Sequence, residues 1–298
     1  MAMKILILGA SGMLGHRLLG SLSAQGNDVV GTVRGDDTTS ATIKIVPAAR
    51  LIGGISVEQD GAVEAVLDQV KPDVVVNCIG VVKQRAAAKD PLISLPVNAL
   101  FPHQLAQACA ERGVRMIHFS TDCVFAGTNG PYTEASRPDP EDLYGRSKLS
   151  GEVNAPNVLT LRTSVIGHEL GEGTGLLAWI LRNRGERVSG YARALYTGVT
   201  TDYMARALLS LLTDFPALCG VWHLSADPIS KYDLASLIDE IYNLGLTIDR
   251  DESYVRDRRL DSTALRNRAG IVPPSWREMV EEMHANYDRR EVPETAAK

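Results

Sequence analysis

The chain of 298 residues is 45% hydrophobic and 22% charged, with a formal net charge of −5 at pH 7. These values are ordinary for a globular protein long enough to form one or two domains. The acidic balance argues against a nucleic-acid partner, because nucleic-acid-binding domains usually present a basic surface. No apolar run approaches the ~20 residues of a membrane span, and the first residues do not resemble a signal peptide, so we expect no membrane contact.

The four cysteines stand far apart, and no two of them form a CxxC pair. Zinc sites and dithiol redox sites usually show such pairs, so the sequence predicts neither of them and no catalytic metal. Unpaired thiols are typical of a reducing compartment, and we therefore expect a cytoplasmic protein.

The start of the chain predicts a unit of strand, turn, helix and strand. Residues Met3–Leu8 form an apolar run that indicates a buried strand, and leucines at helical spacing follow it. The helix is expected to end at Gln25–Gly26, before a second strand over Asp28–Val33. The length of this segment suits the first βαβ unit of a dinucleotide-binding fold.

The alternation continues over the middle of the chain. A helix over 60–70 precedes a strand at Asp73–Cys78, and an irregular, proline-containing helical stretch over 90–113 precedes a strand at Arg115–Ser120. Buried strands of this kind, separated by helices, predict a parallel sheet that is covered on both faces. The sequence therefore indicates an α/β protein with a Rossmann-like, doubly wound parallel sheet.

The pattern loosens in the second half of the chain. Further strands are predicted at 158–162 and 221–225, and further helices near 175–184, 201–212, 231–244 and 275–287. No Gly/Ser linker divides the chain, so we expect the second lobe to be interleaved with the first. The expected organisation is an NADP-binding domain over 1–165, with later returns near 190–225, and a smaller, mainly substrate-binding C-terminal lobe over 166–298.

Gly9, Gly12 and Gly15 have the spacing GxxGxxG directly after the first strand. Glycine lets the chain turn sharply there, and lets the backbone approach a pyrophosphate with no Cβ in the way. The helix that follows directs its free N–H groups and the positive end of its dipole at the phosphates. A plain tight turn is the alternative interpretation.

The second strand ends in Thr32-Val33-Arg34, where NAD enzymes favour an acidic residue that accepts from the ribose 2′-OH. A guanidinium suits a 2′-phosphate by its charge and its planar donors. The sequence therefore favours NADP(H) over NAD(H). In the alternative interpretation Arg34 is solvated, and Asp36 or Asp37 reads an NAD ribose.

Tyr144 and Lys148 form a YxxxK pair, which a helix would place on one face. A free tyrosine has a pKa near 10, and a neighbouring ammonium is expected to lower it. Lys148 is also able to hydrogen-bond the nicotinamide ribose. A solvent-facing pair is the alternative, because tyrosine and lysine often meet at this spacing by chance.

Two other signals point to the same cleft. Ser120 and Thr121 end the strand before the YxxxK pair, and a hydroxyl there is able to hold a substrate carbonyl oxygen. Asn77-Cys78-Ile79 ends the preceding strand of the sheet. Ligands of open α/β sheets bind at the carboxyl ends of the strands, so these groups are expected to converge.

Five segments in this order resemble the extended short-chain dehydrogenase/reductases, and they span most of the chain: GASGMLG from Gly9, NCIG from Asn77, FSTDCVFAG from Phe119, YGRSK from Tyr144 and LRTSVIG from Leu161. Within that family the chain is most similar to nucleotide-sugar 4-ketoreductases of the dTDP-4-dehydrorhamnose reductase type. Several segments look more like a subgroup that reduces UDP-linked 2-acetamido-2,6-dideoxy-4-ketohexoses.

The resemblance implies an NADPH-dependent oxidoreductase that reduces the 4-keto group of a nucleotide-linked 6-deoxysugar. Tyr144 would protonate the developing alkoxide, Thr121 would hydrogen-bond it, and Lys148 would tune Tyr144 and hold the ribose. The residues implied to cradle the pyrophosphate are Gly9, Ser11, Gly12, Met13 and Leu14. Those implied to line the cofactor farther along are Asn77, Cys78, Ile79, Ser120, Tyr144 and Lys148.

The resemblance also helps to weigh related activities. Nucleotide-sugar 4,6-dehydratases read TDE at the strand end, whereas here Asp122 is followed by Cys123. A thiol is a poor substitute for that carboxylate in an elimination, so we expect no dehydratase step. Two alternatives stay open: an epimerase of the same sugar class, and a non-catalytic, nucleotide-binding regulatory subunit, for which an intact catalytic set would be unnecessary.

The expected partner is a nucleotide-diphosphate-sugar, with no nucleic acid and no membrane, and association as a homodimer is left open. Lys83 or Arg193 is expected to pair with the diphosphate, with surface solvation as the alternative for Lys83. His168 follows the sixth strand, where a structural role is the more common one. The substrate candidates are Val81, Lys83, Asp122, Val165, His168, Arg193 and Tyr196. The sequence does not specify the base, the sugar or the product epimer.

Overall fold

The computed structural model describes residues 2–35, 50–170 and 173–288. Its centre is a seven-stranded, all-parallel sheet. In spatial order the strands are β11 (Gly220–His223), β6 (Val158–Thr163), β5 (Arg115–Thr121), β4 (Val74–Asn77), β1 (Lys4–Leu8), β2 (Asp28–Thr32) and β3 (Arg50–Ile52). The predicted doubly wound parallel sheet is confirmed. Strand order reverses between β1 and β4, and this is where such sheets bind ligands.

The apolar run of β1 is explained by burial on both faces of the sheet. Ile5 and Ile7 belong to one core cluster, whereas Leu6 and Leu8 belong to another. Successive side chains of a strand point to opposite faces, so a strand covered on both sides needs apolar residues throughout.

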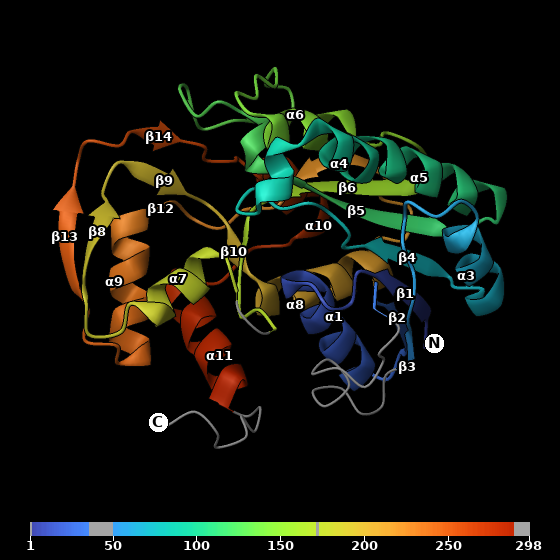
Figure 1. Ribbon diagram of the computed structural model, residues 1–298, viewed down its shortest axis with the longest axis horizontal. Coiled ribbons are helices and arrows are strands. Elements are labelled where there is room, and N and C mark those ends of the chain that lie inside the picture. The colour runs from blue at the N-terminus through green and yellow to red at the C-terminus, as the bar shows by residue number, and fades with distance from the viewer. Residues whose placement is uncertain (1, 36–49, 171–172, 289–298) are drawn as a thin grey trace.

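Helices form a layer on each face (Figure 1). The first face is covered by α1 (Met13–Ala24) and α8 (Thr201–Thr213), and the second by α3 (Ala62–Val70) and α5 (Phe101–Glu111). The predicted irregular stretch before α5 consists of α4 (Pro91–Leu95) and a π-helical turn over Pro96–Leu100. Proline has no backbone N–H, so it disturbs the regular helical bonding at this point.

The second lobe is built around small sheets that the sequence did not predict. In one sheet, β9 (Ala194–Tyr196) lies between β12 (Ile229–Ser230) and β14 (Arg256–Asp257). A second sheet pairs β8 (Arg187–Tyr191) with β13 (Thr247–Asp251), and a third pairs β7 (Val165–Ile166) with β10 (Val199–Thr200). Most of these strands are too short to show a periodicity. The helices of this half are α7 (Leu176–Arg182), α9 (Lys231–Tyr242), α10 (Thr263–Ala269) and α11 (Trp276–Asp288), with α6 (Leu143–Ser150) preceding β6.

One apolar core joins the two lobes. The cluster that contains Ile5 of β1 and Leu18 of α1 also contains Leu234 of α9 and Met279 of α11. Burial of these side chains against each other explains why no flexible linker separates the lobes. In the part of the chain that the structure describes, no helix is long and apolar enough to span a bilayer.

Candidate active site

The glycine loop after β1 is shaped by a close approach between the loop and helix α1. Gly9 has a φ of +81°, in the left-handed region that favours glycine. A Cβ on Gly15 would lie 2.2 Å from the carbonyl oxygen of Gly9, so only glycine lets α1 start this close to the strand. The spacing GxxGxxG is thus explained by two contacts with backbone atoms.

The start of α1 fits an anionic ligand. Gly12 is its N-cap and forms no side-chain cap hydrogen bond, and the first turn, which the structure describes in full, carries no acidic residue. The N–H groups of that turn have no partner within the helix, and the helix dipole favours a negative charge there. Ser11 and Gly12 are exposed, whereas Met13 and Leu14 are partly buried. These residues suit the pyrophosphate of a dinucleotide.

Arg34 is exposed just beyond β2, at the same edge of the sheet. The competing candidates Asp36 and Asp37 lie outside the described residues. Asn77 is buried and ties the end of β4 together, because its amide oxygen accepts from the Ile79 N–H at 3.1 Å. Cys78 lies beside Lys148, whose charge acts on its thiol, although burial raises the pKa of Cys78 to about 12.

The structure brings Thr121 and Tyr144 together. Thr121 ends β5, and its hydroxyl accepts from the Cys123 N–H at 3.1 Å and lies 3.1 Å from Asp122 Oδ1. The Thr121 hydroxyl acts on Tyr144 and favours its phenolate, so the two side chains lie near each other. Asp142 caps helix α6 by accepting from the Gly145 N–H at 2.8 Å. This cap fixes the start of the helix, in which Tyr144 is the second residue.

The pKa of Tyr144 is raised, which corrects the lowering predicted from the YxxxK spacing. Although Tyr144 is partly exposed, the surrounding protein disfavours its phenolate, and Cys123 adds to this effect, while Thr121 opposes it. The ammonium of Lys148 acts instead on Glu152 and Cys78. In the free protein Tyr144 therefore stays protonated at neutral pH, in the form that donates a proton.

Lys148 is 7% exposed, and burial lowers its pKa to about 8, against the attraction of Glu152 and Cys78. The unfolded chain, with a pKa near 10.5, therefore binds this proton more tightly than the folded protein. The unfolding free energy should rise with pH between about 8 and about 10.5, because the penalty on the buried charge disappears over that range.

We therefore expect Lys148→Met to raise the unfolding free energy of the free protein by on the order of 3 kcal/mol at pH 7. The advantage over the wild type should shrink as the pH approaches about 10.5. Urea denaturation of both proteins along this pH range measures the difference. Equal stability at pH 7 would show that the buried ammonium is fully compensated.

A buried ion pair holds the end of α6 to the sheet. Arg162 of β6 donates to both carboxylate oxygens of Glu152, each at 2.7 Å, and both side chains are 7% exposed. The Ser120 hydroxyl donates to the same carboxylate at 2.6 Å. The Ser120 hydroxyl is therefore hydrogen-bonded to Glu152 in this structure, whereas the sequence predicted a contact between Ser120 and the cofactor.

The comparisons with known proteins agree with this geometry. Residues 3–289 match the family described as the RmlD substrate binding domain. The chain belongs to this family. It is an NAD(P)-dependent oxidoreductase of the extended short-chain type.

Similar proteins cover nearly the whole chain. A dTDP-4-dehydrorhamnose reductase from Burkholderia thailandensis is 30% identical, in an alignment that covers 92% of this chain and 96% of that protein. A probable low-salt glycan biosynthesis reductase from Haloferax volcanii is 28% identical, over 96% of this chain and 98% of that protein. The crystal structure of dTDP-4-dehydrorhamnose reductase from Bacillus anthracis in complex with NADP has a TM-score of 0.79 at 21% identity, over 95% and 99% of the two chains, and shows the same fold.

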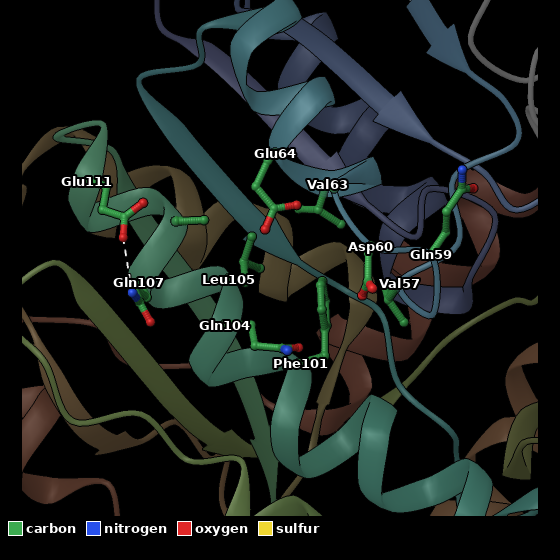
Figure 2. A pocket seen from close by; sticks show the side chains of 12 residues that line it. Val57, Gln59, Asp60, Val63, Glu64, Phe101, Gln104, Leu105, Gln107 and Glu111 are labelled. Carbon is green, nitrogen blue, oxygen red and sulfur yellow. Dashed lines mark hydrogen bonds between the residues drawn. The ribbon is translucent and has the colours of Figure 1, made fainter.

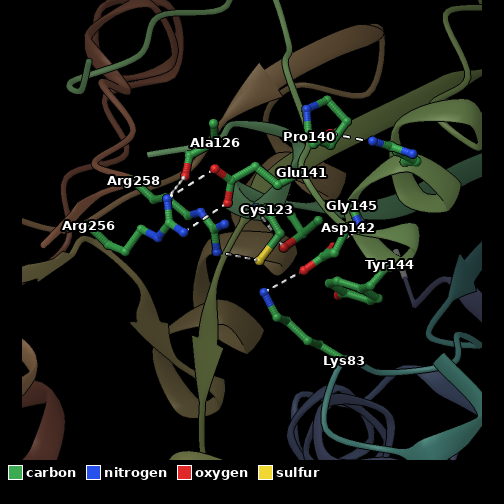
Figure 3. A network of polar contacts seen from close by, with 12 residues as sticks. Lys83, Cys123, Ala126, Pro140, Glu141, Asp142, Tyr144, Gly145, Arg256 and Arg258 are labelled. Carbon is green, nitrogen blue, oxygen red and sulfur yellow. Dashed lines mark hydrogen bonds and ion pairs between the residues drawn. The ribbon is translucent and has the colours of Figure 1, made fainter. Parts of the chain in front are cut away.

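In this RmlD-family chain, some of the predicted substrate residues lie near helix α6, which carries Tyr144. Figure 3 shows Lys83 paired with Asp142 at 2.7 Å beside Tyr144. The backbone of Val81 is held by the Asn98 amide, which also donates to Ser147 of α6 at 3.2 Å. Asp122 follows Thr121 directly, as described above.

Other predicted substrate residues have different surroundings. His168 is hydrogen-bonded to Tyr242 of α9 at 2.9 Å and stacks on Tyr287 of α11, so these contacts belong to the packing of the lobe. Arg193 is exposed, Val165 is partly buried in β7, and Tyr196 is buried in β9. Asp122 acts electrostatically on Tyr196, so this residue lies nearer to the end of β5.

Two cations that no sequence motif indicated come from the second lobe and lie near the residues that follow β5. Arg258 donates to the Cys123 sulfur at 3.4 Å (Figure 3). Lys231, the first residue of α9, interacts electrostatically with Asp122 and Cys123. Neither residue stands in a motif, and only folding brings them near residues more than a hundred positions away in the chain.

A separate surface hollow of about 240 Å³ lies between α3 and α5 (Figure 2). Three carboxylates line it, from Asp60, Glu64 and Glu111, and none of the catalytic or glycine-loop residues does. Its charge does not suit a nucleotide, so it is not part of the active site. Among the described residues no group of His, Cys, Asp and Glu is arranged to hold a metal ion.

Proposed function

We propose that this protein uses NADPH to reduce the 4-keto group of a nucleotide-linked 6-deoxysugar. The observation that carries the proposal is that Thr121 acts on Tyr144 and that Lys148, on the same helix, acts on Cys78, whose backbone lies against Gly9 of the glycine loop. The relatives named dTDP-4-dehydrorhamnose reductase support this substrate class.

The bound nicotinamide supplies hydride to the carbonyl carbon. The chain's own groups act on the carbonyl oxygen. Tyr144, which is protonated at neutral pH, donates its proton to that oxygen as negative charge develops, and Thr121 donates a hydrogen bond to it. Lys148 holds the nicotinamide ribose, and its buried charge favours the tyrosinate that forms when the proton leaves.

The residues after Thr121 support reduction over elimination. Burial raises the pKa of Cys123 to about 12, with Asp122 adding to the effect. The thiol therefore stays protonated at neutral pH and does not serve as the base that the removal of a C5 proton requires. The four free cysteines also support our assignment of the protein to a reducing, cytoplasmic compartment.

Arg34 supports the preference for NADP(H), because its guanidinium stands at the end of β2 with no acidic residue at that position. The Bacillus anthracis neighbour also binds NADP. We further propose that residues 1–165, with later returns near 190–225, form the cofactor domain and that the lobe over 166–298 is mainly the one that binds the nucleotide-sugar.

The proposal is tested by following NADPH absorbance, and then NADH absorbance, with two ketosugars prepared in situ by a dehydratase. The substrates are dTDP-4-keto-6-deoxyglucose and the UDP-linked 2-acetamido 4-keto sugar. Rapid NADPH oxidation with one of them identifies the reductase and its nucleotide. Cofactor binding without oxidation of either would contradict the reductase, and isomerisation of the sugar without net oxidation would identify an epimerase.

A further inference from the structure

Lys231 is placed against Tyr196 by the pairing of two short strands. β12 runs antiparallel to β9, so that Ile229 pairs with Tyr196 and Ser230 with Leu195. Ser230 caps helix α9 by accepting from the Asp233 N–H at 2.9 Å. Lys231 follows at once, and its Nζ lies 3.6 Å from the centroid of the Tyr196 ring, within the range of a cation–π contact.

Tyr196 connects this lysine to the catalytic strand ends. The side chain of Ser164 acts on its hydroxyl. Ser164 follows Thr163 at the end of β6, and Thr163 pairs with Thr121 across the parallel sheet. The carboxylate of Asp122 acts on both Tyr196 and Lys231. The ammonium therefore lies on the side of the second lobe that faces the Thr121–Tyr144 pair.

The ammonium of Lys231 contacts the Tyr196 ring and no acceptor among the residues that the structure describes. Over residues 2–35, 50–170 and 173–288, no hydrogen bond or ion pair of Lys231 is found, although an ammonium carries three N–H donors. The Tyr196 ring attracts the charge but accepts none of these bonds in a normal geometry. Lys83, by contrast, is already paired with Asp142. Burial lowers the pKa of Lys231 to about 8, so the amine is mainly charged at pH 7.

Lys231 is partly exposed, so its ammonium keeps N–H donors that a ligand is able to use. We propose that Lys231 donates a hydrogen bond to an oxygen substituent of the substrate's sugar ring and is a specificity-determining residue of this enzyme. This inference rests on the proposed function.

The position of Lys231 favours the sugar over the diphosphate. Asp122 and Cys123 directly follow Thr121, which holds the reacting carbonyl oxygen in the proposed reaction. In a 4-ketosugar the diphosphate is attached at C1, across the ring from C4. A cation that interacts with the residues next to Thr121 is therefore closer to the reacting side of the ring than to the phosphates.

The test compares how tightly the NADPH-loaded protein binds a nucleotide-sugar and the matching nucleoside diphosphate. The probes are dTDP-glucose against dTDP, and UDP-N-acetylglucosamine against UDP, measured by calorimetry. These sugars carry no 4-keto group, so NADPH does not reduce them. Lys231→Met should weaken binding of the nucleotide-sugar by about 10- to 100-fold, the effect of losing one hydrogen bond to a charged group, and leave binding of the diphosphate unchanged.

Kinetics supply a second readout. In Lys231→Met the KM for the ketosugar should rise by a similar factor, while kcat changes far less, because the interaction is made in the ground state as well. Lys231→Gln, which keeps a donor but removes the charge, should give an intermediate effect and serves if the methionine variant does not fold. The control is Lys89→Met, at an exposed lysine outside the cleft, which should alter neither affinity.

Four results would overturn the inference. Equal weakening of nucleotide-sugar and diphosphate binding would place the ammonium at the phosphates, and unchanged binding of both would remove it from the site. If the wild type reduces a ketosugar while Lys231→Met behaves identically, only this inference fails. If the wild type neither reduces nor binds any nucleotide-sugar, the proposed function fails and the inference falls with it.

Discussion

Tyr144→Phe is expected to lower kcat for ketosugar reduction by about 10²–10⁴-fold, the usual contribution of a positioned general acid. The substitution removes one oxygen and keeps the ring, so the cleft retains its shape. The proton for the developing alkoxide must then come from water. Binding of NADPH should change little, because the glycine loop is not affected.

The chain offers a matched control for this experiment. The hydroxyl of Tyr132 is buried and accepts from three backbone N–H groups, those of Gly127, Thr128 and Asn129, at 3.1–3.2 Å. Tyr132→Phe should therefore lower the unfolding free energy by about 1–3 kcal/mol, because buried donors lose their acceptor, while kcat stays close to the wild-type value. Full activity in Tyr144→Phe would refute the assignment of Tyr144 as the proton donor.

Arg162→Met is expected to lower the unfolding free energy by about 3–5 kcal/mol, because it leaves the Glu152 carboxylate buried without its cation. Arg162 contacts both oxygens of that carboxylate, and each side chain is 7% exposed. Glu152 follows helix α6, which carries Tyr144 and Lys148, so the variant should also lose activity. Urea denaturation monitored by circular dichroism measures the change in stability.

The double variant Arg162→Met/Glu152→Gln separates the loss of the pair from the burial of a lone charge. Removing both charges should recover part of the stability, because no ion then remains buried without a partner. Arg277→Met is a suitable control. Its ion pair with Glu240 has the same chemistry at 2.8 Å, but both side chains are at least half exposed, so it should cost less than about 1 kcal/mol. A loss in Arg162→Met as small as in this control would contradict the expectation.

The features that could be predicted from the sequence are those set by short stretches of chain. The parallel sheet was predicted because strands such as β1 are apolar on both faces. The glycine loop was predicted because Gly9 and Gly15 each meet a backbone constraint that acts within a few residues. The motifs around Thr121 and Tyr144 were sufficient to indicate the family, and the comparisons confirmed it.

The second lobe was predicted less completely. Strands β9, β12 and β14 are two or three residues long, too short for a period to show. His168 was a substrate candidate because it follows a strand, yet its imidazole contacts Tyr242 and Tyr287, which come from helices far along the chain. The direction of the Tyr144 pKa was also predicted wrongly, because burial disfavours the phenolate and the ammonium of Lys148 acts on Glu152 and Cys78 instead.

By itself the sequence determined the fold class, the turn after β1 and the family of this protein, because each depends on backbone constraints and polarity patterns between near neighbours. Only the tertiary structure decided which charges meet across the cleft. Arg258 reaches Cys123 and Lys231 reaches the surroundings of Asp122, although more than a hundred residues separate each pair in the chain. Contacts of this kind leave no local pattern, because they arise from the packing of the two lobes around one shared core.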